Sequence, residues 1–226
     1  MHDETAQIAV RINSLRSLDG VRDILTCLEL RGSTVQALVL PKVESGDELC
    51  WAGTLADEAG SRLDLYAIVE TTAGLENCAE IARSHARVRA LFFGGFDLST
   101  ALGCAMDWES LLYARARLVH AAALAGVEAL DSPYPDVENL TGLRASAEQA
   151  KSLGMAGKAA KNAVQIPVIA EVFTPKSEEV DKARKILELF DADPTKPLIF
   201  NGKLIELPTI KRLRRICGLE SAPRAL

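Results

Sequence analysis

Apolar and polar positions along this chain form blocks that predict strands separated by amphipathic helices. Short apolar runs begin near residues 8, 35, 63, 88, 128 and 157, so the intervals between them are 27, 28, 25, 40 and 29 residues. Between the runs, apolar residues recur at helical spacing, most clearly over residues 18–28 and 108–125. This alternation predicts an α/β fold with a parallel sheet.

The spacing of the strands favours a TIM (β/α) barrel. Most intervals are close to the ~30 residues of one βα unit, and no Gly-x-Gly-x-x-Gly motif follows a strand, which disfavours a dinucleotide-binding fold. About six of the usual eight βα units are visible, so we expect a barrel that is N-terminally incomplete. Glycine stops and capping residues predict helices over residues 45–60, 75–86, 108–125, 139–153 and 177–190.

The last part of the chain has a different pattern from the strand–helix units. Two short apolar runs flank Gly202 and predict a hairpin, and a basic helix follows. We therefore divide the chain into a barrel domain, residues 1–197, and a C-terminal hairpin and helix, residues 198–226.

Composition and charge then exclude several classes of function. The net charge of −5 gives no basic field for nucleic acid, and no apolar run approaches the ~20 residues that span a bilayer. The acidic N-terminus lacks the order of a signal peptide, and the five cysteines are scattered, without a Cys-x-x-Cys pair. We therefore expect a cytoplasmic protein that binds neither nucleic acid nor membrane.

Candidate chemistry gathers where consecutive strands end in charged residues. Glu70 ends the third apolar run, and Asp97 follows the fourth across Gly94 and Gly95. Parallel α/β folds place their ligands at the carboxyl edge of the sheet, where these two carboxylates could converge on one Mg²⁺ or Mn²⁺ ion. The alternative is that each carboxylate caps the following helix or pairs with Lys42 or Arg11. The sequence leaves both interpretations open.

Five further residues at the expected rim have possible roles in the site and alternative structural roles. Arg11 and Asn13 could clamp a carboxylate or an enolate oxygen, or Arg11 could form a structural ion pair with an acidic neighbour, Glu44 or Glu70. Lys42 and Glu44 are most simply a mutually neutralising pair. Asp131, before Ser-Pro, fits a turn or capping role as well as a site role.

Taken together, the motifs in this order resemble those of the citrate lyase beta-subunit-like family. They cover about residues 8 to 216: Arg11-Ile-Asn13-Ser, Leu-Pro41-Lys42-Val-Glu44-Ser, Ile-Val-Glu70-Thr-Thr-Ala-Gly74, Phe-Gly94-Gly-Phe-Asp97-Leu, Tyr113-Ala-Arg115, Gly157-Lys158, Phe173-Thr-Pro and Gly202-Lys-Leu-Ile-Glu206-Leu-Pro. The resemblance implies a (β/α)₈-type barrel, often trimeric, that makes or breaks C–C bonds in short acyl thioesters carried on coenzyme A or an acyl carrier protein.

The resemblance also implies roles for individual residues. Glu70 and Asp97 match the family's Mg²⁺ ligands, and Arg11 matches the arginine that holds the substrate's oxygen atoms. The turn formed by Thr72, Ala73 and Gly74 matches the backbone that receives the keto-acid carboxylate. Glu206 stands where many lyases of the family have an aspartate, which a neighbouring subunit offers to protonate or deprotonate the acetyl carbon.

The sequence departs from the family pattern at three places. The family's first two βα units have no counterpart here, Asn162-Ala163 replaces a usual His-Pro, and Glu206 is one methylene longer than the usual acid. The resemblance implies an Mg²⁺-dependent lyase of a citryl, malyl or citramalyl thioester, and the departures leave open a non-catalytic scaffold or regulatory subunit. A pyruvate-type aldolase acting on free aldehydes is a third interpretation. We also expect a homo-oligomer, a trimer or a dimer, because an open barrel leaves sheet edges unpaired.

Overall fold

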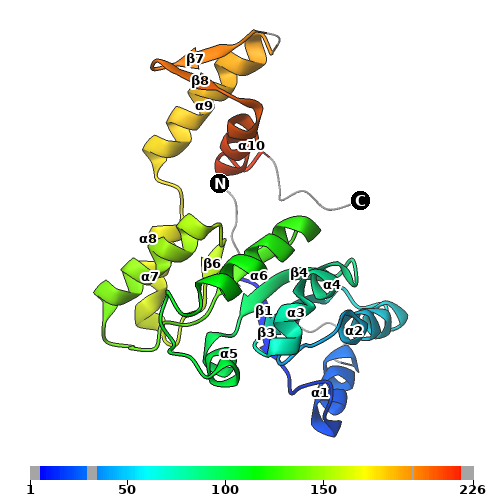
Figure 1. Cartoon of the computed structure of the whole chain (residues 1–226). Helices are drawn as coiled ribbons and strands as arrows, with labels where there is room; N and C mark the ends of the chain where they lie inside the picture. The colour runs from blue at the N-terminus through cyan, green and yellow to red at the C-terminus, as the bar shows by residue number, and fades with distance from the viewer. Residues whose placement is uncertain (1–5, 30–34, 195, 220–226) are drawn as a thin grey trace.

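The computed structural model describes residues 6–29, 35–194 and 196–219, and within them one parallel sheet forms the centre of the molecule (Figure 1). Its six strands are β1 (Ile8–Arg11), β2 (Val35–Leu40), β3 (Asp64–Val69), β4 (Val88–Phe93), β5 (Glu128–Asp131) and β6 (Gly157–Lys158). They lie side by side in chain order, and every neighbouring pair is parallel. This curled, open sheet has the topology of an incomplete (β/α) barrel, which confirms the predicted fold class.

Helices connect successive strands and cover one face of the sheet (Figure 1). They are α1 (Leu18–Glu29), α2 (Gly46–Glu58), α3 (Thr72–Glu76), α4 (Cys78–Arg83), α5 (Gly95–Leu102), α6 (Leu112–Ala125), α7 (Leu140–Leu153) and α8 (Ile166–Phe173), the last preceded by a short 3₁₀ turn, Ala163–Gln165. A parallel sheet requires such crossovers because consecutive strands run in the same direction.

The main core lies between the sheet and its covering helices. Alternate side chains of β3, at Leu65, Ala67 and Val69, are fully buried against this layer. The intervening side chains, such as Tyr66 and Ile68, lie on the barrel's inner face and are half-buried. Successive side chains of a strand point to opposite faces of the sheet, so one face of β3 packs against the helices and the other faces the inside of the barrel.

Four predicted helix features differ from the structure. The helix predicted over residues 75–86 is two helices, α3 and α4, interrupted at Asn77, whose Nδ2 donates to the Glu44 backbone oxygen at 2.7 Å. The helix predicted from residue 108 begins at 112. The sequence reading missed α5 and α8; α8 starts with a proline in its first turn and packs against α7.

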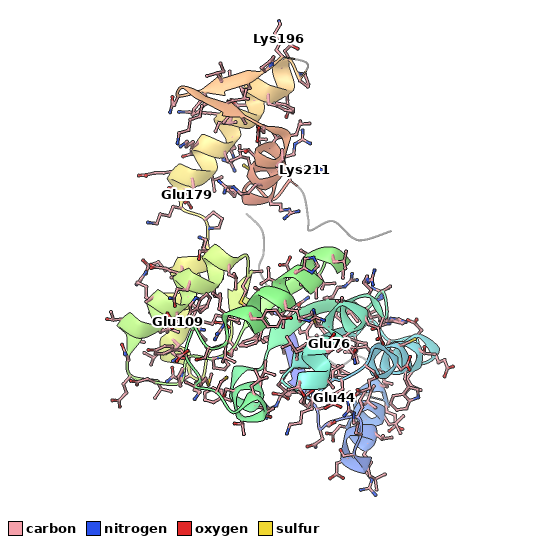
Figure 2. All side chains as sticks on the ribbon, viewed as in Figure 1. Glu44, Glu76, Glu109, Glu179, Lys196 and Lys211 are labelled. Atoms are coloured by element: carbon pink, nitrogen blue, oxygen red, sulfur yellow. The ribbon has the colours of Figure 1, made fainter. Side chains whose placement is uncertain are left out.

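A second, smaller unit follows the barrel strands. Helix α9 (Ser177–Ala192), the antiparallel hairpin of β7 (Leu198–Phe200) and β8 (Lys203–Ile205), and α10 (Leu207–Ile216) share their own apolar cluster. Figure 2 shows Glu179 and Lys211 in this unit, apart from Glu44 and Glu76 on the barrel. The domain division after residue 197 stays a prediction, and the packed C-terminal unit that the structure describes includes α9.

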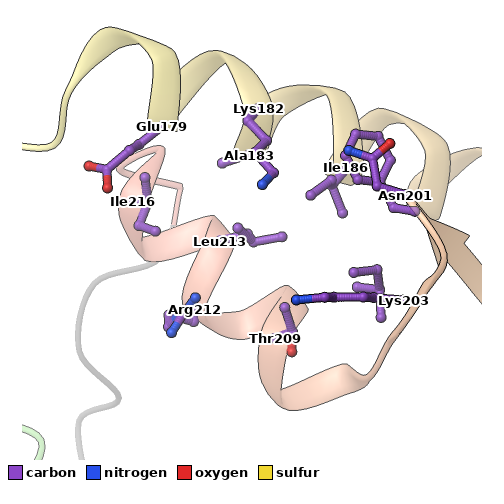
Figure 3. Close-up of a pocket in the computed structure, with 12 residues that line it drawn as sticks. Glu179, Lys182, Ala183, Ile186, Asn201, Lys203, Thr209, Arg212, Leu213 and Ile216 are labelled. Atoms are coloured by element: carbon purple, nitrogen blue, oxygen red, sulfur yellow. The ribbon is translucent and has the colours of Figure 1, made fainter.

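The C-terminal unit encloses a groove between α9 and α10 (Figure 3). It has a volume of about 490 Å³ and is lined by apolar side chains such as Ile186 and Leu213 and by basic ones such as Lys182, Lys203 and Arg212. The groove thus belongs entirely to the unit formed by α9, the hairpin and α10.

The described residues contain no helix that is long and apolar enough to cross a membrane. The five cysteines are free thiols, and burial raises the pKa of the Cys27 and Cys78 thiols. A raised pKa lowers the fraction of reactive thiolate, so these two side chains behave as small apolar residues of the core.

Candidate functional site

The carboxyl ends of β3 and β4 bring the two predicted metal ligands to one edge of the sheet. Glu70 follows β3 directly, and Asp97 lies in the first turn of α5, which begins immediately after β4. Val69 and Phe93, the last residues of the two strands, are partners in the parallel register. The pairing therefore fixes where the chain leaves both strands, and with it the placement of Glu70 and Asp97.

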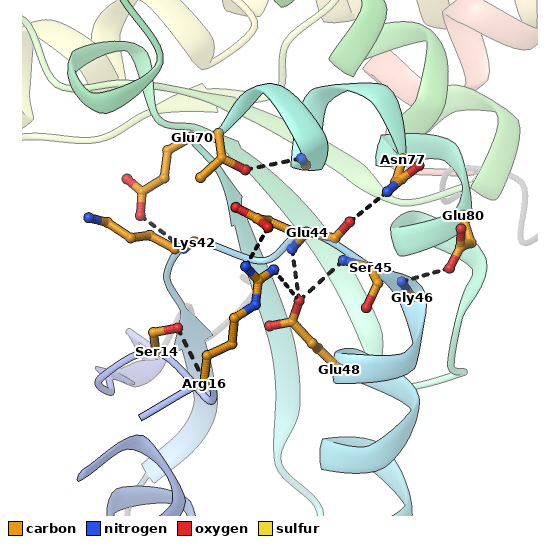
Figure 4. Close-up of polar contacts among 12 residues, drawn as sticks. Ser14, Arg16, Lys42, Glu44, Ser45, Gly46, Glu48, Glu70, Asn77 and Glu80 are labelled. Carbon is orange, nitrogen blue, oxygen red and sulfur yellow. Dashed lines mark hydrogen bonds and ion pairs between the residues drawn. The ribbon is translucent and has the colours of Figure 1, made fainter. Parts of the chain in front are cut away.

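Lys42 contacts both carboxylates, and Figure 4 shows its contact with Glu70. Its backbone N–H donates to Glu70 Oε1 at 2.9 Å, and its Nζ lies 3.4 Å from Asp97 Oδ2. Lys42 has a φ of 54°, in the left-handed region that a side chain with a Cβ rarely adopts. Strained backbone of this kind concentrates at functional sites, and here it turns the N–H of Lys42 towards Glu70.

The predicted Lys42–Glu44 pair is wrong. Glu44 instead forms an ion pair with Arg16, which also contacts Glu48 at 2.8 Å (Figure 4). The hydrogen bond from Arg16 lowers the pKa of the Glu44 carboxyl. Sequence reasoning missed Arg16 because no local spacing links the loop after β1 to α2. Its ion pairs fasten the loop after β2 and leave the Lys42 ammonium free to reach Asp97.

Glu70 occupies a half-buried, electrostatically strained position. Burial raises the pKa of its carboxyl, Asp97 raises it further, and the hydrogen bond from Lys42 together with the charges of Lys42 and Arg11 offsets only part of this effect. A divalent cation beside both carboxylates would remove this penalty, because it compensates their charges at short range.

The glycine at the end of β4 leaves room for the Glu70 carboxylate. A Cβ on Gly94 would lie 2.2 Å from Glu70 Cβ and 2.9 Å from Glu70 Oε2. Only a residue without a side chain fits against Glu70 in its present position. The close packing of Glu70 therefore explains why the first residue of the Gly94–Gly95 pair is a glycine.

Arg11 and Asn13 have different environments at the end of β1. Arg11 is exposed and makes no hydrogen bond or ion pair within the part of the chain that the structure describes, so the alternative of a structural pair with Glu44 or Glu70 is wrong there. Asn13 donates through both its backbone N–H and its Nδ2 to Asp23 Oδ2, each at 2.9 Å. Arg11 therefore remains the candidate anion clamp, whereas Asn13 fixes the loop that follows β1.

The turn after Glu70 forms the start of α3. Thr71 caps the helix by accepting the N–H of Gly74 on its Oγ1 at 3.0 Å. The Gly74 amide is therefore occupied, and the amides of Thr72 and Ala73 donate to no acceptor among the described residues. Of the predicted backbone donors, Thr72 and Ala73 are the ones available to a carboxylate. Sequence reasoning did not identify Thr71 as the residue that caps this helix.

Two predicted positions lie away from Glu70 and Asp97. Asp131 is fully buried and accepts Arg115 Nε at 3.0 Å and Lys158 Nζ at 2.5 Å, so it is neither a turn residue nor a helix cap. Glu206 is exposed between β8 and α10, and Figure 1 shows this hairpin on the opposite side of the molecule from α5. Within one chain, the structure does not bring Glu206 to the rim.

The donor set at the rim fits a hard cation. The Glu70 carboxylate accepts the Lys42 backbone N–H, and the Asp97 carboxylate pairs with the Lys42 ammonium, so both carboxylates lie next to the same residue. The described residues contain no group of three or more acidic, histidine or cysteine side chains placed to hold a metal. Mg²⁺ suits such a site, because it is commonly held by one or two carboxylates and completes its coordination with water and substrate oxygens.

Comparison with known proteins gives a consistent assignment. The sequence profile of the HpcH/HpaI aldolase/citrate lyase family matches residues 1–163. Mouse mitochondrial citramalyl-CoA lyase is 30% identical over 96% of this chain and 70% of its own length. The L-malyl-CoA/beta-methylmalyl-CoA lyase of Cereibacter sphaeroides is 29% identical over 91% of this chain and 73% of its own.

A protein with a similar fold has been solved with ligands bound. Protein CitE from Mycobacterium tuberculosis, in complex with magnesium, acetoacetate and coenzyme A, superimposes with a TM-score of 0.72 at 26% identity. The match covers 93% of this chain and 78% of that one.

Proposed function

Because this chain belongs to the HpcH/HpaI aldolase/citrate lyase family, a family of carbon–carbon lyases, we propose that it is a Mg²⁺-dependent lyase of a short 3-hydroxyacyl-CoA thioester of the citryl, malyl or citramalyl type. The observation that carries the proposal is the convergence of Glu70 and Asp97 on Lys42 beside the unpaired Arg11. The relatives named as CoA-thioester lyases, and the neighbour that holds magnesium and coenzyme A, support the substrate class.

The proposed reaction divides the substrate into a keto acid and an acetyl thioester. A general base takes the hydroxyl proton, the new carbonyl forms as the C–C bond breaks, and the electron pair of that bond passes to the thioester as an enolate. Glu70 and Asp97 would hold Mg²⁺, which when bound supplies positive charge to the oxygens of the keto-acid half. A proton added to the enolate carbon completes the acetyl thioester.

The chain's own groups can orient this substrate. The Arg11 guanidinium, which has no hydrogen-bond or ion-pair partner among the described residues, can donate two parallel hydrogen bonds to a carboxylate, or a hydrogen bond to an enolate oxygen. The amides of Thr72 and Ala73, at the start of α3, can receive the keto-acid carboxylate. Glu206, exposed on the C-terminal unit, would deliver the carbon-bound proton to the site of a neighbouring subunit, and this requires a homo-oligomer.

A substrate panel tests the proposal. Citryl-, malyl- and citramalyl-CoA are incubated with the protein and Mg²⁺, and keto-acid release is measured. Glu70→Gln should abolish release and Mg²⁺ binding, whereas the control Glu76→Gln, which removes only an exposed ion pair with Arg117, should preserve both (Figure 2). No keto acid from any substrate, with Mg²⁺ affinity unchanged by Glu70→Gln, would overturn it.

A non-catalytic scaffold or regulatory subunit is the second candidate. The described residues offer two carboxylates at the rim and keep Glu206 away from them within one chain. The same panel separates the candidates, because a scaffold would bind Mg²⁺ through Glu70 and still release no keto acid in any assembly state.

A further inference from the structure

A second pocket lies behind the carboxyl ends of β5 and β6, apart from the rim formed by Glu70 and Asp97. It has a volume of about 370 Å³, and its walls come from the loop before α6, the residues after β5 and the inner side of α7. Trp108, Ser132 and Tyr134 line it, and neither rim carboxylate does. The pocket is therefore a separate site.

The base of this pocket is a buried cluster of charges. Arg115 and Lys158 both contact Asp131, and all three side chains are at most 9% exposed. Two cations facing one buried carboxylate leave an excess of one positive charge. An excess charge away from water is costly, and burial lowers the pKa of Lys158 accordingly. An anion in the pocket would balance the cluster.

Two hydrogen-bonding groups of the pocket are buried without a partner. Arg115 uses its Nε for Asp131, whereas among the described residues its Nη1 has no acceptor and the Ser132 hydroxyl has neither donor nor acceptor. Buried polar groups are normally satisfied, so unpaired donors on the wall of a cavity indicate a missing ligand. The residues that carry these two groups, Arg115 and Ser132, line the same pocket, and so does Lys158.

The Arg115 guanidinium is held rigidly for recognition of a planar anion. Its central carbon lies 4.6 Å from the ring centre of Phe93 and 4.8 Å from that of Trp108. Stacking on these rings restricts the guanidinium plane, and an oriented guanidinium matches the geometry of a carboxylate.

The charge around the pocket limits the anion to a single negative charge. Asp131 already balances one of the two cations, and Asp107 adds an exposed carboxylate to the lining. A doubly charged phosphate or sulfate would leave the cluster with excess negative charge. We propose that Arg115, Ser132 and Lys158 form a binding site for a small monocarboxylate, in addition to the site at the rim.

Fluorescence of Trp108 tests this site directly. The chain has two tryptophans, so Trp51→Phe leaves Trp108 as the sole reporter. The full-length variant is titrated without divalent metal with sodium acetate, and separately with sodium sulfate at matched ionic strength. We expect a saturable change in emission with acetate and a much weaker response to sulfate.

Variants separate the carboxylate site from non-specific effects. Ser132→Ala removes a hydroxyl that has no partner, so the fold should persist, and acetate affinity should fall about tenfold because a hydrogen bond to a charged group is lost. Ser152→Ala is the control and should bind as the parent does, because Ser152 lies on α7, does not line the pocket, and donates its hydroxyl to the Gln149 backbone oxygen. Arg115→Lys keeps the charge without Nη1 and should also weaken binding.

Three results would overturn the carboxylate site. The proposal fails if acetate gives no saturable response or if sulfate gives an equal one. It also fails if the parent, Ser132→Ala and Arg115→Lys bind acetate with equal affinity. Any of these results would mean that water fills the pocket and no carboxylate site exists. Glu70→Gln should retain acetate binding, so a failure of the proposed lyase function at the rim is distinguishable from a failure of this site.

Discussion

Single residues at the rim balance opposing charges, and Glu70 illustrates this most directly. Its carboxylate is half-buried and lies near Asp97, and its pKa is raised mainly by burial. Lys42 offsets the repulsion with one N–H and one ammonium contact. The metal-free protein therefore retains a destabilising group at the position where the proposed function needs a ligand, which is a common compromise between stability and activity.

Replacing Glu70 should reveal this compromise. A carboxyl whose pKa is raised by folding makes the folded state bind more protons than the unfolded state, so stability falls as the pH rises through the range between the two values. At pH 7 without metal, Glu70→Gln should raise the thermal unfolding midpoint. It should also weaken Mg²⁺ binding by at least about 100-fold, measured by calorimetry. A lower midpoint without metal would contradict this account.

Glu44 should show the opposite pH dependence. Arg16 lowers the pKa of Glu44, so the unfolded chain binds more protons than the folded one between the two pKa values. The stabilisation from the pair is present above the unfolded value, about 4.3, and is lost as the pH falls through the lower folded value. Urea unfolding should show Glu44→Gln less stable by roughly 0.5–1 kcal/mol at pH 7, because the pair is partly exposed.

The difference between Glu44→Gln and the parent should begin to shrink as the pH falls below about 4.3, and it should vanish below the lower folded pKa of Glu44, where both proteins carry a neutral group at this position. A difference that persists unchanged at low pH would mean that shape, rather than charge, accounts for the effect.

At the level of elements, some of the site was predictable and some was not. The strand ends and the pairing of neighbouring strands were predictable from the apolar runs, so Glu70 and Asp97 were expected together. The Lys42–Asp97 ion pair was one of the open alternatives, and the structure contains it. The Glu44–Arg16 pair was not predictable, because it depends on a loop contact without a local pattern. The long interval between the fourth and fifth strands contains α5, and this explains why it exceeds the other intervals.

Helix α6 contained a signal that sequence reasoning did not use. Leu111, Ala114 and Leu118 mark its buried stripe, and Arg115 falls on the same stripe. A charge at a core position of an otherwise apolar helix predicts a buried partner. The partner itself, Asp131 on β5, could only be found from the folded structure.

The junction of β4 and α5 gives a prediction at this level. Gly94→Ala would place a Cβ against Glu70, so we expect a loss of roughly 1–3 kcal/mol of stability together with weaker Mg²⁺ binding. Gly60→Ala is the control: Gly60 has a φ of 62° and open space around it, so its cost of about 1 kcal/mol comes from the backbone alone. Denaturant unfolding and calorimetry measure both quantities. Equal Mg²⁺ affinity in the Gly94 variant would contradict the contact.

At the scale of the whole molecule, two apolar clusters organise the chain. One lies beneath the helices of the barrel, and the other joins α9, α10 and the hairpin. The hairpin unit also exposes Ile199, Leu204 and Leu207, each at least 59% accessible. An exposed apolar patch of this kind favours contact with another protein surface.

We therefore expect a homo-oligomer, a trimer or a dimer, in which the hairpin contacts another subunit. Ile199→Lys combined with Leu204→Lys should shift the protein towards monomer in light scattering without lowering its unfolding midpoint, because both side chains are exposed. Leu124→Lys, at an exposed position of α6, is the control and should leave assembly unchanged. A monodisperse, fully active parent monomer at assay concentration would refute the expectation.

The chain-order arrangement of the parallel strands has a consequence for how the protein reaches its fold during synthesis. Each new strand joins a neighbour that the ribosome has already released, and the C-terminal unit closes on its own cluster. Contacts between close sequence neighbours carry little loop-closure cost, so the barrel can grow one unit at a time from its N-terminal edge. Glu70, directly after β3, and Asp97, on α5, can thus reach their folded positions before α7 and the hairpin have left the ribosome.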